Sequence, residues 1–537
     1  MRSWWLAMLA LSVVRPNNSR DVRMDLKNLC INEILSQITT GRLCCVDVVR
    51  YFLGRIEEYN TVLNAAITVD YDGAVRAAEA LDHHYRTTGG AIKGRLHCVP
   101  AFVKDNILVK GLPTTLGIRL FVNATADEDA PAVARLRKEG AVIMGKANMI
   151  MFAAGPTDVG SETGGLARNP YAYNFTVVGS STGNAVILAA RLAVIGIGSD
   201  SGGSVTAPSS ATHVVGLRPA SGSMDMRDVF PLLGQPFDTV GPMALNVKDV
   251  ITLLEVLRED DFRQSVSPDR RIRVGILHSL TYGTVNVSAP LLDPPGYFIT
   301  TTYSVDPEIQ DCFRKFQSNL DTLSAKHNIG TTIITDNVVE LARPVLDNEN
   351  HRWSCIVSDM TRFLKHRPMR SSSGQMIGSA DGIARHQSTP AFYRSLLGLL
   401  SKRTVSCPAS RQRYGRNLSI VRRRLQSKIF DRVDVVVMPT LNSLPWPIPD
   451  HRQGPNSIQD DLPYPNSNGH LHDLGGLFAL PALNVPLCFS KPYPGAPQGL
   501  PIGGYFMTMP DRVSLMLELA RIYEEQFKES RLPQLIA

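Results

Sequence analysis

The sequence has few cysteines and no recognisable metal-binding motif. Only eight cysteines occur in 537 residues, no two are spaced as Cys-x-x-Cys, and no His-Glu-x-x-His is present. Zinc sites built on thiolates or on a peptidase helix need those spacings. The sequence therefore predicts no metal and no cofactor. So low a cysteine density does not require disulfides, and it leaves any pairing open.

Long apolar runs and phosphate-binding glycine patterns are also missing. No run reaches the roughly 20 residues that cross a bilayer as a helix. Gly196-Ile-Gly198 begins like a dinucleotide-binding loop, but Ser201 stands at the third glycine position. The net charge is +7, and the densest basic runs, 270–273 and 422–424, carry no interleaved aromatic residues. We expect no membrane span, no dinucleotide site and no nucleic-acid partner.

No Pro- or Ser-rich linker divides the chain. Its composition, 44% hydrophobic and 20% charged, is typical of a globular protein with ample material for a core. Length alone would suggest about three domains, but the continuous pattern favours one domain over residues 24–530.

The N-terminus carries features of a secreted protein. Arg2 precedes an apolar run over residues 4–14, which has the length of a signal-peptide core. Glycosylation sequons stand at Asn17, Asn123, Asn174, Asn286 and Asn417. Residues 1–23 are interpreted either as a signal peptide or as a disordered N-terminus, so secreted and cytoplasmic locations stay equally open.

Local patterns predict several helices and loops. Apolar residues at helical spacing predict two helices within residues 32–59, broken near 40–41. A third helix is expected over 72–84, with Asp72 as its N-cap. The Ser- and Gly-rich stretch 371–378 is typical of a loop.

Two small, hydroxyl-rich loops flank one apolar segment within residues 178–208. The first reads Val178-Gly-Ser-Ser-Thr-Gly-Asn184 and the second Ser199-Asp-Ser-Gly-Gly-Ser204. A short helix over 185–191 and a buried strand over 192–198 would bring the two loops together. Gly202 and Gly203 present backbone N–H groups just before Ser204. This layout indicates a nucleophile beside an oxyanion hole.

A serine nucleophile needs a base, and neither loop contains a histidine. Lys104 ends the apolar run 98–103, upstream of both loops. Burial in such surroundings lowers the pKa of a lysine, which can then accept a proton near neutral pH.

Lys104, Ser180 and Ser204 resemble the Ser-Ser-Lys triad of the amidase signature family. The two serines lie 24 residues apart, which is the separation in that family. Further similar segments lie at 99–106, 140–148, 169–170, 215–219, 238–243, 434–440 and 480–486. The resemblance spans roughly residues 26–525 and is weakest over 255–430. Segment 238–243 is also similar to a signal-bearing subgroup of fungal and plant members.

The resemblance implies an α/β fold, with one large mixed sheet covered on both faces by helices. It implies hydrolysis of a carboxylic amide to an acid and ammonia or an amine, with a variable region at about 255–430 lining the substrate entrance. The implied roles are Ser204 as nucleophile, Ser180 beside a cis peptide bond as proton relay, and Lys104 as base. Ser181 is expected in a supporting role, either capping the following helix or hydrogen-bonding Ser180 and the substrate, while the backbone around Ser201, Gly202 and Gly203 binds the oxyanion.

Several residues depart from the family pattern. Val178 and Thr182 replace glycines, and Thr206 stands where many members have arginine. Segment 149–153 is apolar where the family usually has an acidic residue. These changes keep open a weakly active, amidase-like subunit or binding scaffold.

An α/β-hydrolase is the other alternative. Residues 179–183 fit Gly-x-Ser-x-Gly, with 175–178 as the preceding strand, Ser181 as nucleophile and His470 or His472 as base. That interpretation leaves Lys104 and the Ser204 loop without a role. The expected partner is a small-molecule amide, and both a monomer and a homodimer remain open.

Overall fold

The computed structural model describes residues 26–154, 160–258, 270–290, 298–346, 355–401, 407–448, 473–529 and 531–533. The N-terminal segment 1–23, with its sequon at Asn17, lies outside the described residues. So do His470 and His472.

One 11-stranded mixed sheet runs through the described part of the chain. Its central strands pair in both directions. Strand β2 runs parallel to both β3 and β4, whereas β4 and β6 are antiparallel. Across the sheet the strands are β1 (Ala66–Val69), β3 (Val142–Ala147), β2 (Pro100–Lys104), β4 (Ile195–Asp200), β6 (Thr239–Ala244), β5 (Val215–Arg218), β14 (Ala482–Phe489), β15 (Pro501–Thr508), β13 (Val435–Pro439), β7 (Ile272–Leu277) and β10 (Ile329–Ile334).

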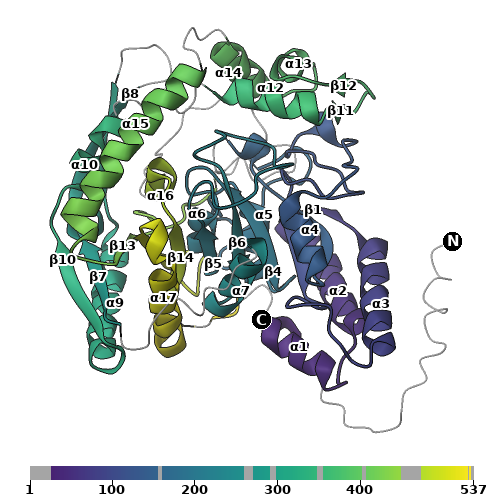
Figure 1. Ribbon diagram of the computed structural model, residues 1–537, viewed down its shortest axis with the longest axis horizontal. Helices are drawn as coiled ribbons and strands as arrows, with labels where there is room; N and C mark the ends of the chain where they lie inside the picture. Colours follow the sequence, from purple (N-terminus) through teal and green to yellow (C-terminus); the bar gives the residue numbers. More distant parts are fainter. Residues whose placement is uncertain are drawn as a thin grey trace.

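Helices cover both faces of this sheet, as the resemblance implied (Figure 1). Successive side chains of a strand point to opposite faces. In β13, Val435 and Val437 pack into one hydrophobic cluster, and Val436 and Met438 pack into another. The alternation shows that β13 is buried on both sides.

Different helices contribute to the two clusters. The first cluster takes in α1 (Ile31–Thr39), α2 (Cys45–Leu63), α3 (Tyr71–Thr87), α4 (Pro131–Lys138), α5 (Thr182–Ala189), α7 (Val247–Arg258), α9 (Pro307–His327) and α17 (Val513–Phe527). The second takes in α8 (His278–Thr281), α10 (Val338–Leu346), α12 (Ile356–His366), α13 (Ala380–Arg385), α14 (Ala391–Ser401), α15 (Cys407–Leu425) and α16 (Leu474–Phe478). Helix α6 (Thr206–Ala211) follows the second serine loop.

The local predictions are confirmed in part. Helices α1 and α2 separate where the sequence predicted a break. Helix α3 is capped by Asp70, whose carboxylate accepts the Gly73 N–H at 2.9 Å, so the assignment of Asp72 was wrong. Segment 371–378 is not wholly a loop. Its residues Met376 and Ile377 pair, as a short antiparallel strand, with Arg370 and Met369. The two short strands are β11 (Met369–Arg370) and β12 (Met376–Ile377). A separate hairpin joins β8 (Thr284–Pro290) to β9 (Phe298–Ser304).

Six of the eight cysteines form disulfides. The pairs are Cys45–Cys98, Cys312–Cys488 and Cys355–Cys407. Cys30 and Cys44 are unpaired. Composition alone left this pairing open, because it depends on which elements the fold places side by side.

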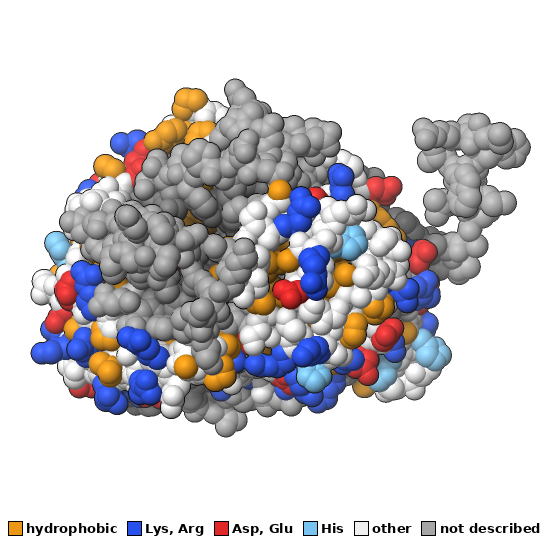
Figure 2. Space-filling model, turned by 90° about the horizontal axis from the view of Figure 1, so that it is seen from above, with side chains coloured by type: hydrophobic (Ala, Val, Ile, Leu, Met, Phe, Trp, Pro, Cys, Tyr) orange, Lys and Arg blue, Asp and Glu red, His pale blue; other side chains and the backbone are white. Residues whose placement is uncertain are grey.

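Basic side chains are spread over the face in Figure 2 among acidic and apolar ones. None of the described helices combines the length and apolar character that a membrane crossing requires.

Candidate active site

Lys104 is the last residue of β2 and lies inside the protein. Strand β2 pairs in parallel with β4, with Val103 opposite Ile197, which brings the end of β2 next to the end of β4. Its Nζ donates to the Ser180 hydroxyl oxygen at 2.7 Å and to the Ser199 carbonyl at 3.0 Å. The side chain is completely buried. The structure thus joins two of the three residues expected to form the triad.

Burial lowers the pKa of Lys104 from the usual lysine value to about 7. Taking an ammonium out of water costs free energy, and this favours the neutral amine. Asp200 and Asp238 act in the opposite direction, because negative charges favour the protonated lysine. Near neutral pH the side chain can therefore both release and accept a proton.

Ser180 follows a cis peptide bond to Gly179, the position that the resemblance implied. A Cβ on Gly179 would lie 2.1 Å from the Ile150 Cδ1 atom, so a larger residue there would require the Ile150 side chain to move. The preceding Val178 has φ of 58°, a conformation that is rare for a β-branched residue. Valine therefore occupies a backbone position suited to the glycine that the family usually has there.

The two serine loops meet as predicted. The Ser181 N–H donates to the Ser204 carbonyl at 3.1 Å. Helix α5 and strand β4 make the connection, although the helix covers 182–189 instead of 185–191 and the strand 195–200 instead of 192–198. Ser204 is half-buried, and its hydroxyl has no hydrogen-bond partner among the residues that the structure describes. The hydroxyl is thus not committed to any structural contact.

Asp200 holds the second loop, and this changes the expected oxyanion hole. Its carboxylate accepts the Gly203 N–H at 2.8 Å and the Val205 N–H at 2.7 Å. Gly203 was expected to bind the oxyanion, but its N–H is occupied by a buried carboxylate. The N–H groups of Gly202 and Ser204 have no partner within the described part of the chain.

The side chain of Ser201 is held by a hydrogen bond to Asp238. Its hydroxyl donates to Asp238 Oδ1 at 2.6 Å. The backbone N–H groups of Leu232, Leu233 and Gly234 complete the hydrogen bonding of this carboxylate. Burial raises the pKa of Asp238, while these hydrogen bonds oppose the shift.

Arg218 is a site residue that the sequence interpretation missed. It is fully buried, and its guanidinium donates at 2.9 Å to both the carbonyl and the carboxylate of Asp200. Since a buried charge requires a partner, an arginine at the end of the apolar segment 214–217 was a usable signal. The pair ties β5 to the second serine loop.

Ser181 is placed as a supporting residue. It occupies the N-cap position of α5 without a side-chain capping bond, and its buried hydroxyl donates to the Ser199 carbonyl at 3.3 Å. Residues 175–178 form no strand of the sheet, and only an isolated bridge joins Phe175 to Pro447. The strand expected before an α/β-hydrolase nucleophile is absent from these described residues.

The apolar segment 149–153 packs inside the protein. Phe152 lies 4.9 Å from the Tyr393 ring, measured between ring centroids, and the Tyr393 hydroxyl donates to the Met151 carbonyl at 3.0 Å. The segment therefore joins the region around Ser180 to α14.

One group of potential metal ligands occurs among the described residues, formed by Cys45, His97 and Cys98. Both sulfurs are committed to the Cys45–Cys98 disulfide. This cluster is therefore no metal site in the structure.

Comparison with known proteins agrees with the geometry. The sequence model of the family described as Amidase matches residues 47–329. The chain belongs to the amidase family. The expected family membership and its amide-hydrolysing activity are confirmed at this level.

Several curated relatives of this amidase are named as one subunit of glutamyl-tRNA(Gln) amidotransferase. The protein from Archaeoglobus fulgidus is 30% identical over 481 residues, covering 86% of this chain and 93% of the relative. The protein from Symbiobacterium thermophilum is 29% identical, covering 91% and 94%.

Solved structures show the same fold. The peptide amidase of Stenotrophomonas maltophilia has a TM-score of 0.72 at 23% identity, covering 95% of this chain and 99% of that one. A bacterial aryl acylamidase has a TM-score of 0.72 at 21% identity, covering 95% and 98%.

Proposed function

We propose that this amidase cleaves its amide substrate through Lys104, Ser180 and Ser204. Neutral Lys104 accepts the proton of the Ser180 hydroxyl, and Ser180 in turn accepts the proton of the Ser204 hydroxyl. The Ser204 oxygen then attacks the amide carbonyl carbon. A relay is needed because a free serine hydroxyl is a weak nucleophile at neutral pH.

The negative charge that develops on the carbonyl oxygen is stabilised by the second loop. We assign the N–H groups of Gly202 and Ser204 to this role, since they are not used elsewhere in the described residues. Asp200 and Asp238 keep the loop in shape by accepting the Gly203 N–H and the Ser201 hydroxyl. Fixed donors of this kind stabilise the transition state because they need no reorientation during the reaction.

Collapse of the tetrahedral intermediate breaks the C–N bond and leaves an acyl group on Ser204. The proton held by Lys104 passes through Ser180 to the leaving nitrogen, which departs as ammonia or an amine. Water then attacks the acyl group by the same proton route and releases the acid. The products account for every atom of the amide and one water molecule, and no cofactor takes part.

The hydrogen bond from Lys104 to Ser180, together with the lowered lysine pKa, carries this proposal. Labelling with a fluorophosphonate followed by peptide mapping tests it. The label is expected on Ser204. A label on Ser181 would instead support the α/β-hydrolase mechanism, and no label on either serine would support a catalytically weak subunit.

A role as one subunit of a larger assembly is the second candidate, because the curated relatives carry the word subunit in their names. Turnover of simple amides by the purified chain alone would favour the independent enzyme. Activity that appears only with a partner protein would favour the assembly. Size-exclusion chromatography with light scattering would separate a monomer from a homodimer.

We also propose that the chain matures in an oxidising compartment. Three disulfides support this location, because such bonds persist where thiols are not continually reduced. The sequons at Asn123 and Asn174 are exposed. Intact-mass analysis after expression in a eukaryotic secretory host is expected to show glycans and the loss of two hydrogens per bridge. Free thiols at the six cysteines that the structure pairs, in an active and unglycosylated chain, would contradict this.

A further inference from the structure

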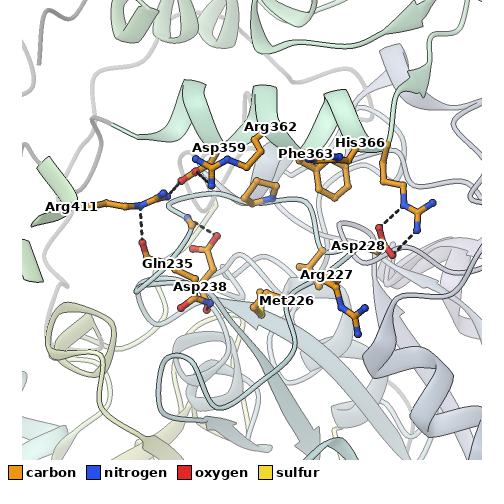
Figure 3. Close-up of a pocket in the computed structure, with 14 residues that line it drawn as sticks. Met226, Arg227, Asp228, Gln235, Asp238, Asp359, Arg362, Phe363, His366 and Arg411 are labelled. Atoms are coloured by element: carbon orange, nitrogen blue, oxygen red, sulfur yellow. Dashed lines mark hydrogen bonds and ion pairs between the residues drawn. The ribbon is translucent and has the colours of Figure 1, made fainter. Parts of the chain in front are cut away.

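A cavity of about 630 Å³ lies between the loop of residues 226–238 and helix α12. Met226 and Val229 line it from the loop, and Phe363 lines it from the helix (Figure 3). Phe363 is held in place by edge-to-face packing on Phe230, with 5.1 Å between ring centroids. The cavity has the volume and the partly apolar lining of a small-molecule site.

The charges at one end of this cavity do not balance. Arg362 and Arg411 both pair with the single carboxylate of Asp359, at 3.4 Å in the case of Arg362. Neither arginine pairs with another acidic group in the described part of the chain. Asp359 is almost fully buried, whereas the Arg362 side chain is 59% exposed. Two guanidinium groups thus share one negative charge and leave one positive charge unmatched.

The other arginines and carboxylates lining the cavity carry no excess positive charge. At the opposite end, Arg367 pairs with Asp228 at 2.7 Å and with Glu128 at 2.6 Å, and Arg227 pairs with Asp225 at 2.6 Å. The remaining carboxylate, Asp238, accepts four hydrogen bonds, from the Ser201 hydroxyl and three backbone N–H groups. The unmatched positive charge is therefore confined to the end that holds Arg362.

We propose that this cavity binds a small carboxylic acid with an apolar body. The carboxylate lies on the guanidinium of Arg362, next to Arg411, and the body lies against Phe363 and Met226. An arginine presents two parallel N–H donors that match the two oxygens of a carboxylate. Figure 3 shows Arg362 and Phe363 together on the helix side of the cavity, above Met226 and Asp238.

The position of the cavity links it to the amidase site. Asp238 lines the cavity and also holds Ser201 in the oxyanion loop. The bound acid can be one of two molecules. It is either the acid part of the amidase's own substrate or product, or a separate effector. Binding of the acid does not depend on the proposed hydrolytic mechanism. A failure of the binding proposal can therefore be distinguished from a failure of the proposed mechanism.

Isothermal titration calorimetry of the full chain with 4-phenylbutyrate tests the binding. The neutral analogue 4-phenylbutanol tests the need for the carboxylate. Saturable binding of the acid is expected, with at least about tenfold weaker binding of the alcohol, because a hydrogen-bonded charge pair is lost. Arg362→Gln is expected to weaken binding of the acid about tenfold, and Arg362→Lys to weaken it less.

Two further variants separate a binding role from a structural one. Asp359→Asn removes the competing carboxylate and is expected to tighten binding of the acid. Arg314→Gln is the matched control, since Arg314 is 56% exposed, pairs with an aspartate three residues earlier and does not line the cavity. The control is expected to leave binding unchanged.

Absence of saturable binding, equal binding of acid and alcohol, or unchanged binding in Arg362→Gln would overturn the proposal. Inhibition of amide turnover identifies the source once binding is seen. Competitive inhibition by 4-phenylbutyrate would assign the cavity to substrate or product. Binding without competition would assign it to a separate effector of the same chemistry.

Discussion

The Lys104 Nζ atom lies 2.7 Å from the hydroxyl oxygen of Ser180, and neither side chain is open to solvent. Such a contact lets a proton pass between the two groups without water. The burial that accompanies the contact lowers the pKa of Lys104 to about 7, so the amine can accept a proton near neutral pH.

Replacement of the two candidate nucleophiles should give unequal effects. Ser204→Ala is expected to lower kcat by on the order of 1,000-fold or more, because it removes the attacking oxygen. Ser181→Ala loses one buried hydrogen bond to the Ser199 carbonyl, and kcat is expected to stay within about tenfold of the wild type. Amide turnover by the two purified variants decides which serine is the nucleophile. Retained activity in Ser204→Ala would exclude Ser204.

Lys104→Met should stabilise the protein at low pH. The unfolded chain binds a proton at Lys104 up to about pH 10.5, but the folded chain only up to about pH 7. The stability of the wild type therefore rises with pH between these values, by up to about 1.4 kcal/mol per pH unit from this group. The variant lacks this dependence, so its advantage in urea unfolding is expected to be largest below pH 7 and to vanish above pH 10.5. An advantage that does not change with pH would contradict the lowered pKa.

Arg218→Met should damage both stability and the pH dependence of catalysis. Loss of the guanidinium leaves Asp200 buried without its ion-pair partner, which costs about 3–5 kcal/mol. The unpaired carboxylate also favours protonated Lys104, so the midpoint of the pH–activity curve is expected to move upward. Arg218→Lys should restore part of both properties. A stability loss with an unmoved midpoint would limit Arg218 to a structural role.

Gly476→Ala probes the support of the second serine loop, which we propose to bind the oxyanion. A Cβ at Gly476 would lie 2.4 Å from the Ser201 carbonyl oxygen and 3.0 Å from the Gly202 Cα atom, so the loop would have to move. We expect kcat to fall on the order of 100-fold, as when an oxyanion donor is misplaced. Gly54→Ala in α2 meets no atom within 4 Å and should leave kcat unchanged while stabilising the helix by about 1 kcal/mol. Equal kinetics in the two variants would contradict this.

Sequence spacing was enough to predict the candidate triad but not the contacts that support it. The separation of Ser180 from Ser204, with a lysine at the end of an apolar run, predicted which loops meet. The contact between Ser201 and Asp238 depends on the antiparallel register of β4 and β6, which places Asp200 opposite Thr239. No local pattern encodes such a register, and the same holds for Arg218 with Asp200.

Helix α5 shows why element ends were misjudged. The helix begins at Thr182, ahead of the predicted start, because Gly183 packs directly on Asn148. A Cβ at Gly183 would lie 2.2 Å from the Asn148 backbone nitrogen. Glycine is a poor helix former in isolation, so tertiary packing decides this boundary.

The rate at which a fluorophosphonate labels Ser204, measured against pH in the wild type and in Lys104→Met, tests the proton relay most directly. In the wild type the rate is expected to rise with pH through a midpoint near 7, the pKa of Lys104. In Lys104→Met labelling is expected to be slow and without that rise. Superimposable profiles for the two proteins would show that Lys104 is not the base.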